Sequence, residues 1–122
     1  MSTLKVANLQ NTGSGAPVFK NSSGTEIGQL CKAWVNFDGT GTVAIRDSFN
    51  VSSLSDDGTG LYTITFTNAQ PNVNYAAVYG ANAGIAGYAG SHTQNTSTLK
   101  IFGSSSGSFN DLNTCNVAVF GD

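Results

Sequence analysis

The sequence predicts an all-β protein: an antiparallel β-sandwich or jelly-roll-like domain preceded by an extended N-terminal arm. Apolar and polar residues alternate with a period of two in many segments, as in strands with one buried face. No stretch of about a dozen residues carries the i, i+3, i+4 apolar stripe of an amphipathic helix. Turn residues interrupt the alternation about every eight to twelve positions, which is typical of sandwiches and barrels.

The alternation is clearest in two segments, residues 33–37 and 62–66. In the second segment Tyr62, Ile64 and Phe66 alternate with threonines, and β-branched and aromatic residues of this kind favour strands. Further strands are expected at residues 42–46, 49–55, 74–80, 99–103 and 115–120, and the alternation of residues 4–10 predicts one more near the N-terminus.

The first 31 residues differ in composition from the rest of the chain. They carry many Asn, Gly and Ser residues between short apolar pieces, so they offer little apolar surface for a core. We therefore interpret residues 1–31 as an N-terminal arm or extended strand pair, and residues 32–122 as the β-sandwich domain.

Length and charge exclude several classes of function. A chain of 122 residues suits one domain with one modest core. Its 5 basic and 7 acidic residues offer no basic patch for nucleic acid or for an anionic membrane surface. No apolar run is long enough to span a bilayer, and residues 1–10 lack the apolar region of an export signal. We expect no nucleic acid, no membrane insertion, and synthesis in a cytosol.

The two cysteines, Cys31 and Cys115, have no second Cys or His at the spacing of a zinc site. In a reducing cytosol we expect both to be buried thiols that act as small hydrophobic side chains. The two cysteines could also form a disulfide later, in an oxidising exterior. The sequence does not decide this, because spacing along the chain does not show how close the two Cα atoms lie. We expect no metal and no cofactor.

The tetrapeptide Asp-Gly-Thr-Gly occurs twice, at residues 38–41 and 57–60. A calcium loop would need acidic or Asn ligands at its third and fifth positions and a Glu at its twelfth, and neither copy has them. A looser contact of Ca²⁺ or Mg²⁺ with Asp56 and Asp57 stays open. The glycines of the first copy fit a dinucleotide-binding pattern, but a strand follows where that pattern requires a helix.

Both copies are better interpreted as hairpin turns. Asp-Gly is a strong hairpin signal, because a type I′ turn needs positive φ at both central residues. The second glycine suits a bulged or longer loop. The flanking segments, 33–37 with 42–46 and 49–55 with 61–66, would then pair. We expect the only arginine, Arg46, to be a surface charge or the partner of a turn Asp that holds the register.

No arrangement of residues predicts catalysis. His92 is the only histidine, and the chain lacks the G-x-S-x-G nucleophile elbow. The aspartates that a glycosidase would need lie mostly in the turns, where Asp usually bonds its own backbone. We therefore expect no catalytic residue and a protein that is not an enzyme.

Residues 74–94 combine glycine, alanine and aromatic residues and allow two interpretations. The ordinary one is a strand, a flexible loop and a second strand. The sharper one places Tyr79, Asn82, Tyr88 and His92 on an exposed tip that binds a sugar ring or a protein surface. The small Gly and Ala side chains would equally let symmetry-related chains approach closely.

Landmark residues follow one another in a familiar order between Ala33 and Val78. They are Trp34-Val35-Asn36-Phe37, Gly39 and Gly41, Ile45-Arg46, Asn50-Val51-Ser52-Ser53, Gly58 and Gly60, Tyr62, Phe66, Pro71 and Tyr75. With these residues the segment, a little over a third of the chain, resembles a module of tail-fibre and other virion structural proteins of tailed bacteriophages, cyanophages especially. Residues 2–15 also resemble the beginning of short virion proteins of marine phages.

The resemblance implies a homotrimeric, β-rich part of a phage particle, on a tail fibre, a head fibre or the capsid exterior. It transfers no catalytic residue. Residues 1–31 would anchor the chain to other virion proteins or interlock the trimer. The β-domain would be displayed outward on a virion assembled in the host cytoplasm, with loops around residues 80–95 touching a host glycan or protein. The chain lacks the long repeating shaft of a complete fibre.

Two other classes of function compete with a virion component. One is a stand-alone lectin-like module that binds carbohydrate in solution. The other is a small depolymerase that cleaves host polysaccharide, in which Asp56 and Asp57 would be the carboxylates.

Overall fold

The computed structural model describes residues 1–13, 15–82, 87–105 and 107–121. Within these ranges the chain forms strands and turns and no helix, which confirms the predicted all-β class. The described residues accordingly include no helix with the length and hydropathy to span a membrane. The chain divides into two units, Met1–Leu30 and Cys31–Asp122, each described by itself below.

The N-terminal unit contains one small antiparallel hairpin, formed by strands β1 (Phe19–Lys20) and β2 (Glu26–Gly28). Its turn is held by Asn21, whose side-chain oxygen accepts hydrogen bonds from the backbone N–H groups of Ser23 (3.1 Å) and Thr25 (2.9 Å). A two-stranded hairpin alone is marginally stable in water. No side chain is buried in the described part of this unit, so it has no core of its own.

The strand predicted at residues 4–10 is wrong, because this segment is not a strand in the structure. A strand needs a neighbour to pair its backbone N–H and C=O groups, and in the described chain this segment belongs to no sheet. Leu4, Val6 and Leu9 remain 76%, 56% and 61% exposed. The apolar residues of this segment are therefore present as the sequence shows, but they are exposed and no other described residues cover them.

The second unit is built from strands connected by short turns and loops. The strands are β3 (Ala33–Asp38), β4 (Ala44–Phe49), β5 (Val51–Gly58), β6 (Leu61–Phe66), β7 (Ala76–Asn82), β8 (Gly87–Gln94), β9 (Thr98–Ser105), β10 (Ser108–Phe109) and β11 (Thr114–Phe120).

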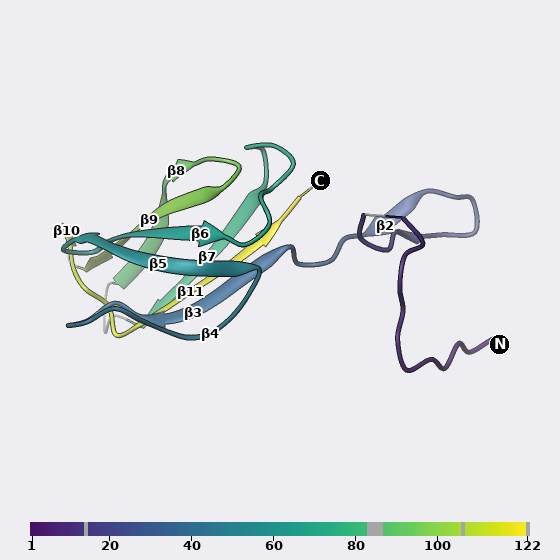
Figure 1. Cartoon of the computed structure of the whole chain (residues 1–122), viewed down its shortest axis with the longest axis horizontal. Helices are drawn as coiled ribbons and strands as arrows, with labels where there is room; N and C mark the ends of the chain where they lie inside the picture. Colours follow the sequence, from purple (N-terminus) through teal and green to yellow (C-terminus); the bar gives the residue numbers. More distant parts are fainter. Residues whose placement is uncertain (14, 83–86, 106, 122) are drawn as a thin grey trace. The chain divides into compact units, whose positions relative to one another are not determined.

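These strands form two antiparallel sheets that pack face to face as a β-sandwich (Figure 1). One sheet has the order β4-β3-β11-β7, and the other has the order β10-β9-β6-β5, with β8 also paired to β9. Both predicted hairpins are present, since β3 pairs with β4 and β5 pairs with β6. The two Asp-Gly-Thr-Gly turns therefore belong to different sheets.

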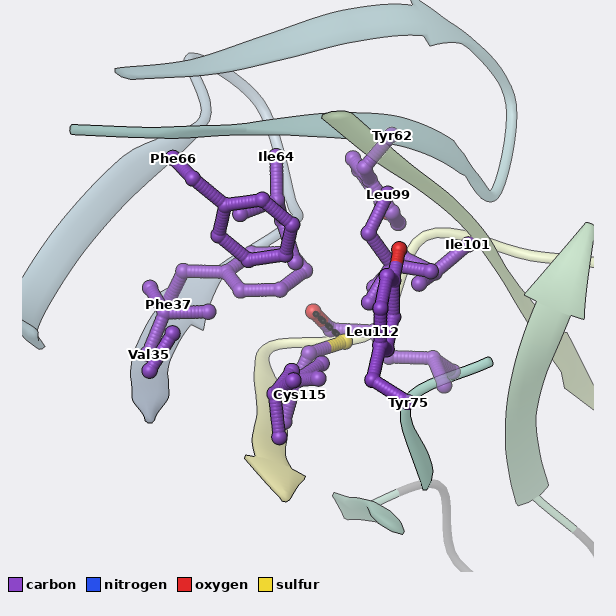
Figure 2. Close-up of a cluster of buried hydrophobic side chains, with 13 residues drawn as sticks. Val35, Phe37, Tyr62, Ile64, Phe66, Tyr75, Leu99, Ile101, Leu112 and Cys115 are labelled. Carbon is purple, nitrogen blue, oxygen red and sulfur yellow. Dashed lines mark hydrogen bonds between the residues drawn. The ribbon is translucent and has the colours of Figure 1, made fainter. Parts of the chain in front are cut away.

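Alternating side chains of β3, β6, β9 and β11 fill the space between the sheets (Figure 2). The buried core consists of Ala33, Val35, Phe37, Tyr62, Ile64, Phe66, Tyr75, Leu99, Ile101, Leu112, Cys115, Val117 and Val119. The rings of Phe37 and Tyr62 pack edge to face with their centroids 5.1 Å apart. The alternation of residues 33–37 and 62–66 thus marks the core face correctly.

The chain passes from one sheet to the other at Asn50. Its φ of 56° makes it the one non-glycine residue with positive φ in the described ranges. Its Nδ2 donates to the carbonyls of Lys32 (3.0 Å) and Asn68 (3.1 Å), and its Oδ1 accepts from the N–H of Asn68 (2.7 Å). The strand predicted at residues 49–55 is therefore interrupted here, because β4 ends before Asn50 and β5 begins after it.

We expect Asn50→Ala to lower the free energy of unfolding by about 2–4 kcal/mol. It removes the side-chain hydrogen bonds and leaves a Cβ in the left-handed region, which alanine tolerates poorly. Asn50→Gly also loses the bonds but keeps a permissive backbone, so its cost should be smaller by about 1 kcal/mol. Urea denaturation of both variants measures the difference. Equal costs would contradict a contribution from the backbone conformation.

Candidate functional site

The first turn, between β3 and β4, is held by Asp38. One carboxylate oxygen accepts hydrogen bonds from the backbone N–H (2.9 Å) and the hydroxyl (2.6 Å) of Thr40, and the other pairs with Arg46 at 3.1 Å. The bonds from Thr40, and secondarily the charge of Arg46, lower the pKa of Asp38. Asp38 is therefore an anion that stabilises the turn.

Arg46 ties the first hairpin to the segment that enters β11. Its guanidinium donates to the carbonyl of Phe37 (3.1 Å), to the hydroxyl of Thr114 (3.4 Å) and to the carbonyl of Asn113. The sequence left two roles open for this arginine, a surface charge or the partner of a turn Asp. In the structure Arg46 pairs with a turn Asp, Asp38. Arg46 thus supports the register of β3 and β4.

Gly39 is required for packing rather than for backbone conformation. The type I′ prediction for the first turn is wrong, because Asp38 and Gly39 do not have positive φ, whereas Gly41 does, at 61°. A Cβ on Gly39 would lie 2.3 Å from the hydroxyl oxygen of Tyr62. The side chain of Tyr62, from the other sheet, therefore occupies the space beside Gly39.

The second turn, between β5 and β6, uses its glycines for backbone conformation. Gly58 has φ 130° and Gly60 has φ 65°, whereas Asp57 does not have positive φ, so the type I′ prediction is wrong for this turn as well. The register shifts just before Gly58, in agreement with the bulged loop that the sequence predicts. Asp57 accepts a hydrogen bond from the hydroxyl of Thr63 (2.6 Å) and pairs with Lys100 at 3.1 Å, and these two contacts lower its pKa, Thr63 contributing most.

Asp111, in the segment between β10 and β11, joins the two turns. Its Oδ1 accepts hydrogen bonds from the N–H of Gly60 (2.7 Å) and from the hydroxyl of Tyr62 (3.2 Å). The same hydroxyl lies 3.0 Å from the carbonyl oxygen of Gly39, so its single proton is shared between these two acceptors. Burial, and secondarily the negative charge of Asp111, raise the pKa of Tyr62, so the hydroxyl keeps its proton and remains a donor.

The acidic residues around the turns therefore have structural partners. Asp38, Asp56, Asp57 and Asp111 each accept a hydrogen bond from a neighbouring backbone or side-chain group. Over the residues that the structure describes, no group of three or more His, Cys, Asp and Glu side chains is arranged to hold a metal ion. The expectation that the chain is not an enzyme stays a prediction.

Both cysteines are free thiols. Cys115 lies in the core at 1% exposure, and burial raises the pKa of its thiol to about 11. Cys31 is only half-buried, and its thiol donates to the carbonyl of Ala33 at 3.2 Å. The predicted role of a small buried hydrophobic side chain thus describes Cys115 better than Cys31.

The residues predicted to form an exposed contact tip lie in two strands. Tyr79 is half-buried in β7 and packs against the hydrophobic core, so it does not stand on an exposed tip. Asn82 ends β7, and Tyr88 and His92 belong to β8, but their side chains lie outside the described part of the structure, as do residues 83–86. A contact role for these residues stays a prediction.

A different set of residues meets on the outer face of the β4-β3-β11-β7 sheet. Residues opposite each other in neighbouring antiparallel strands point to the same face, and the observed register arranges them in two rows. The apolar row consists of Phe49, Trp34, Ala118 and Val78, and the polar row consists of Asp47, Asn36, Asn116 and Gly80.

The two rows border a shallow depression of about 400 Å³, lined by Trp34, Asn36, Val78, Gly80, Asn116 and Ala118 among others. In the apolar row, Trp34 is 36%, Phe49 55% and Val78 59% exposed. In the polar row, the side-chain amide of Asn36 donates to the side-chain oxygen of Asn116. A Cβ on Gly80 would meet Asn116 at an ordinary 3.8 Å, so there is open space above this glycine.

Only some residues of this face could be predicted from the sequence. The alternation of residues 33–37 places Trp34 and Asn36 on the side opposite the core, where both are accessible. It does not show that Val78 and Asn116 lie beside them, because β3, β7 and β11 are far apart in the chain. The composite surface is a product of strand order and register.

The observed fold defines an all-β protein whose two-sheet sandwich carries a mixed apolar and polar outer face. The chain matches no protein-family model, no curated protein and no solved structure. The resemblance to phage virion proteins accordingly rests on the residues that carry it.

We expect Gly39→Ala to lower the free energy of unfolding by about 1–3 kcal/mol, because the new Cβ overlaps Tyr62 and one of the two must move. In a Tyr62→Phe background the cost should be smaller, since the oxygen at 2.3 Å is gone while the ring carbon at 2.6 Å remains. Gly80→Ala is the matched control and should change stability by no more than about 0.5 kcal/mol. Chemical denaturation tests the cycle, and identical costs in both backgrounds would refute the role of the hydroxyl.

We expect the free energy of unfolding to fall as the pH rises above about 9, where a cysteine in the unfolded chain ionises. Folded Cys115 keeps its proton up to about pH 11, so the unfolded state loses protons first and is favoured. The slope from one such group is about 1.4 kcal/mol per pH unit. Urea unfolding at a series of pH values should show a shallower decline for Cys115→Ala. Superimposable profiles for the two proteins would contradict the assignment.

Proposed function

We propose that this protein is a structural component of a bacteriophage virion, on a tail fibre, a head fibre or the capsid exterior. In this proposal it is a homotrimer, its N-terminal unit contacts neighbouring copies or other virion proteins, and the β-sandwich is displayed on the particle surface. Contact with the host cell is a further part of the proposal. The sequence resemblance of residues 33–78 suggests this class.

The observation that carries the proposal is the uncovered apolar surface of the N-terminal unit. Leu4, Val6, Leu9 and Ile27 are all more than half exposed, and no side chain in the described part of the unit is buried. Apolar surface of this kind gains about 25 cal/mol per Å² when it is removed from water. A partner chain would supply the cover that the unit lacks, as expected for a segment that interlocks subunits or anchors them to a particle.

The landmark residues of the resemblance support a scaffold role. Arg46 links the first turn to β11, Tyr62 links the two turns, and Gly39 makes room for Tyr62. Asn50 forms the corner between the sheets. A module whose recognisable residues hold strands and turns together suits a protein selected for a stable shape.

The alternative is a stand-alone lectin-like module. The outer face with Trp34, Asn36 and Asn116 favours it, because an exposed aromatic ring beside amide groups suits carbohydrate. The two functions differ in oligomeric state and in association with particles.

We expect the full chain to have the mass of a trimer by size-exclusion chromatography with light scattering. A triple variant, Leu4→Ser with Val6→Ser and Leu9→Ser, should lose the trimer, because it removes the apolar surface that a partner covers. The matched control is Val73→Ser with Phe109→Ser, at domain positions that are 49% and 51% exposed, and it should stay trimeric.

Mass spectrometry of purified particles of a phage that encodes this chain should find it with a copy number divisible by three. A monomeric full chain that is never found in particles would overturn the proposal and favour the lectin-like alternative.

A further inference from the structure

The outer face of the β4-β3-β11-β7 sheet separates apolar from polar groups in a regular way. The apolar row and the polar row lie two residues apart along each strand, which is about 7 Å. Each row crosses four neighbouring strands, about 14 Å in all. A ligand that matches this face must therefore be narrow, with an apolar surface on one side and hydrogen-bonding groups along its edge.

We propose that this face is a binding site for a neutral oligosaccharide. The C–H face of a pyranose ring is apolar and would stack on the exposed ring of Trp34, with Phe49 and Val78 extending the platform to either side. The ring hydroxyls would meet the polar row, where the amides of Asn36 and Asn116 can both donate and accept. Gly80 leaves the space in which the ligand edge would lie.

Charge favours a neutral ligand over an anionic one. Asp47 belongs to the polar row and is exposed. Residues 31–122 contain three basic and six acidic residues, a formal charge of −3. Arg46, the arginine of the same hairpin, is engaged by Asp38 and by the carbonyl groups of Phe37 and Asn113. A phosphate, sulfate or carboxylate group on the ligand would therefore be repelled.

The dimensions argue against a second copy of the chain as the occupant. A stable protein interface buries about 800 Å² on each partner, with a contiguous apolar centre. The two rows cover about 14 Å by about 7 Å, and half of that area is the polar row; Phe120, two residues beyond Ala118 on β11 and 36% exposed, adds one further apolar side chain to this face. A narrow oligosaccharide fits this pattern, whereas a protein surface would bury Asn36, Asn116 and Asp47 against itself.

The site goes beyond the proposed virion role and does not depend on it, since a trimer or a monomer would bind sugar through the same face. It overlaps only in part with the contact predicted at Tyr79, Asn82, Tyr88 and His92, of which Tyr79 also lines the depression. The two test variants below change residues of the outer face and none of those four.

The test uses the intrinsic fluorescence of the full chain. Trp34 is the only tryptophan, so its emission reports on this face directly when excitation avoids tyrosine. The probes are cellohexaose, maltohexaose and mannohexaose at millimolar concentrations, with hyaluronan hexasaccharide as the anionic counterpart. We expect a saturable change in emission with at least one neutral probe, and binding of the anionic probe at least about tenfold weaker.

Two variants connect the signal to the depression. Gly80→Val places an apolar side chain in it, at a position without positive φ where a Cβ would meet Asn116 at an ordinary 3.8 Å, and it should weaken binding at least about tenfold with little change in the thermal unfolding midpoint. Trp34→Ala should abolish binding measured by calorimetry. Phe109→Ala, on β10 of the other sheet and 51% exposed, is the matched control and should bind as the parent does.

Three outcomes would overturn the site. One is that no neutral probe gives a saturable change. Another is that Gly80→Val binds as tightly as the parent. The third is that the emission of Trp34 depends on protein concentration and Gly80→Val changes the oligomeric state, which would make the face an interface between copies. The first two outcomes do not bear on whether the triple variant of the N-terminal unit loses its trimer, whereas the third would show that the outer face itself takes part in the association of copies.

Discussion

The hydroxyl of Tyr62 connects parts of the chain that no strand pairing joins. It donates toward the carbonyl of Gly39, in the first turn, and toward Asp111, which also accepts the N–H of Gly60 in the second turn. The first turn belongs to one sheet and the second to the other. Because the hydroxyl is buried, leaving it without these partners would carry the full desolvation cost of a polar group. The relative position of the two hairpins at this end of the sandwich depends on this junction.

Because the turns and the core are engaged in holding the domain together, any binding function must use residues on its surface. The acidic residues of the turns are occupied by Thr40, Arg46, Thr63 and Lys100. The core between the sheets is filled by apolar side chains. Among the exposed apolar side chains of the described residues, two groups carry the proposals above: those of the N-terminal unit and those of the apolar row. The described part of the N-terminal unit has no row of polar side chains beside its exposed apolar residues that would select a small ligand. The apolar row lies beside the amides of Asn36 and Asn116 and beside Gly80.

Local signals predicted much of the fold. The alternation of residues 33–37 and 62–66 identified strands and their buried faces, and Asp-Gly identified both turns, because a strand period and a turn depend on neighbours a few residues away. The errors share a cause. Each depends on residues far away in the sequence. A strand at residues 4–10 would need a neighbouring strand to pair with. Gly39 lies beside Tyr62 of the other sheet, and Tyr79 packs against a core that is formed by other strands.

By itself the sequence determined the all-β class, the two hairpins and the inward or outward direction of residues in the clearest strands. These properties follow from side-chain type and spacing within short segments. Only the tertiary structure decided that Trp34 and Asn36 share a face with Val78 and Asn116. Asn36 and Asn116 are 80 positions apart and become neighbours because packing of the whole core sets the order and register of β3, β11 and β7.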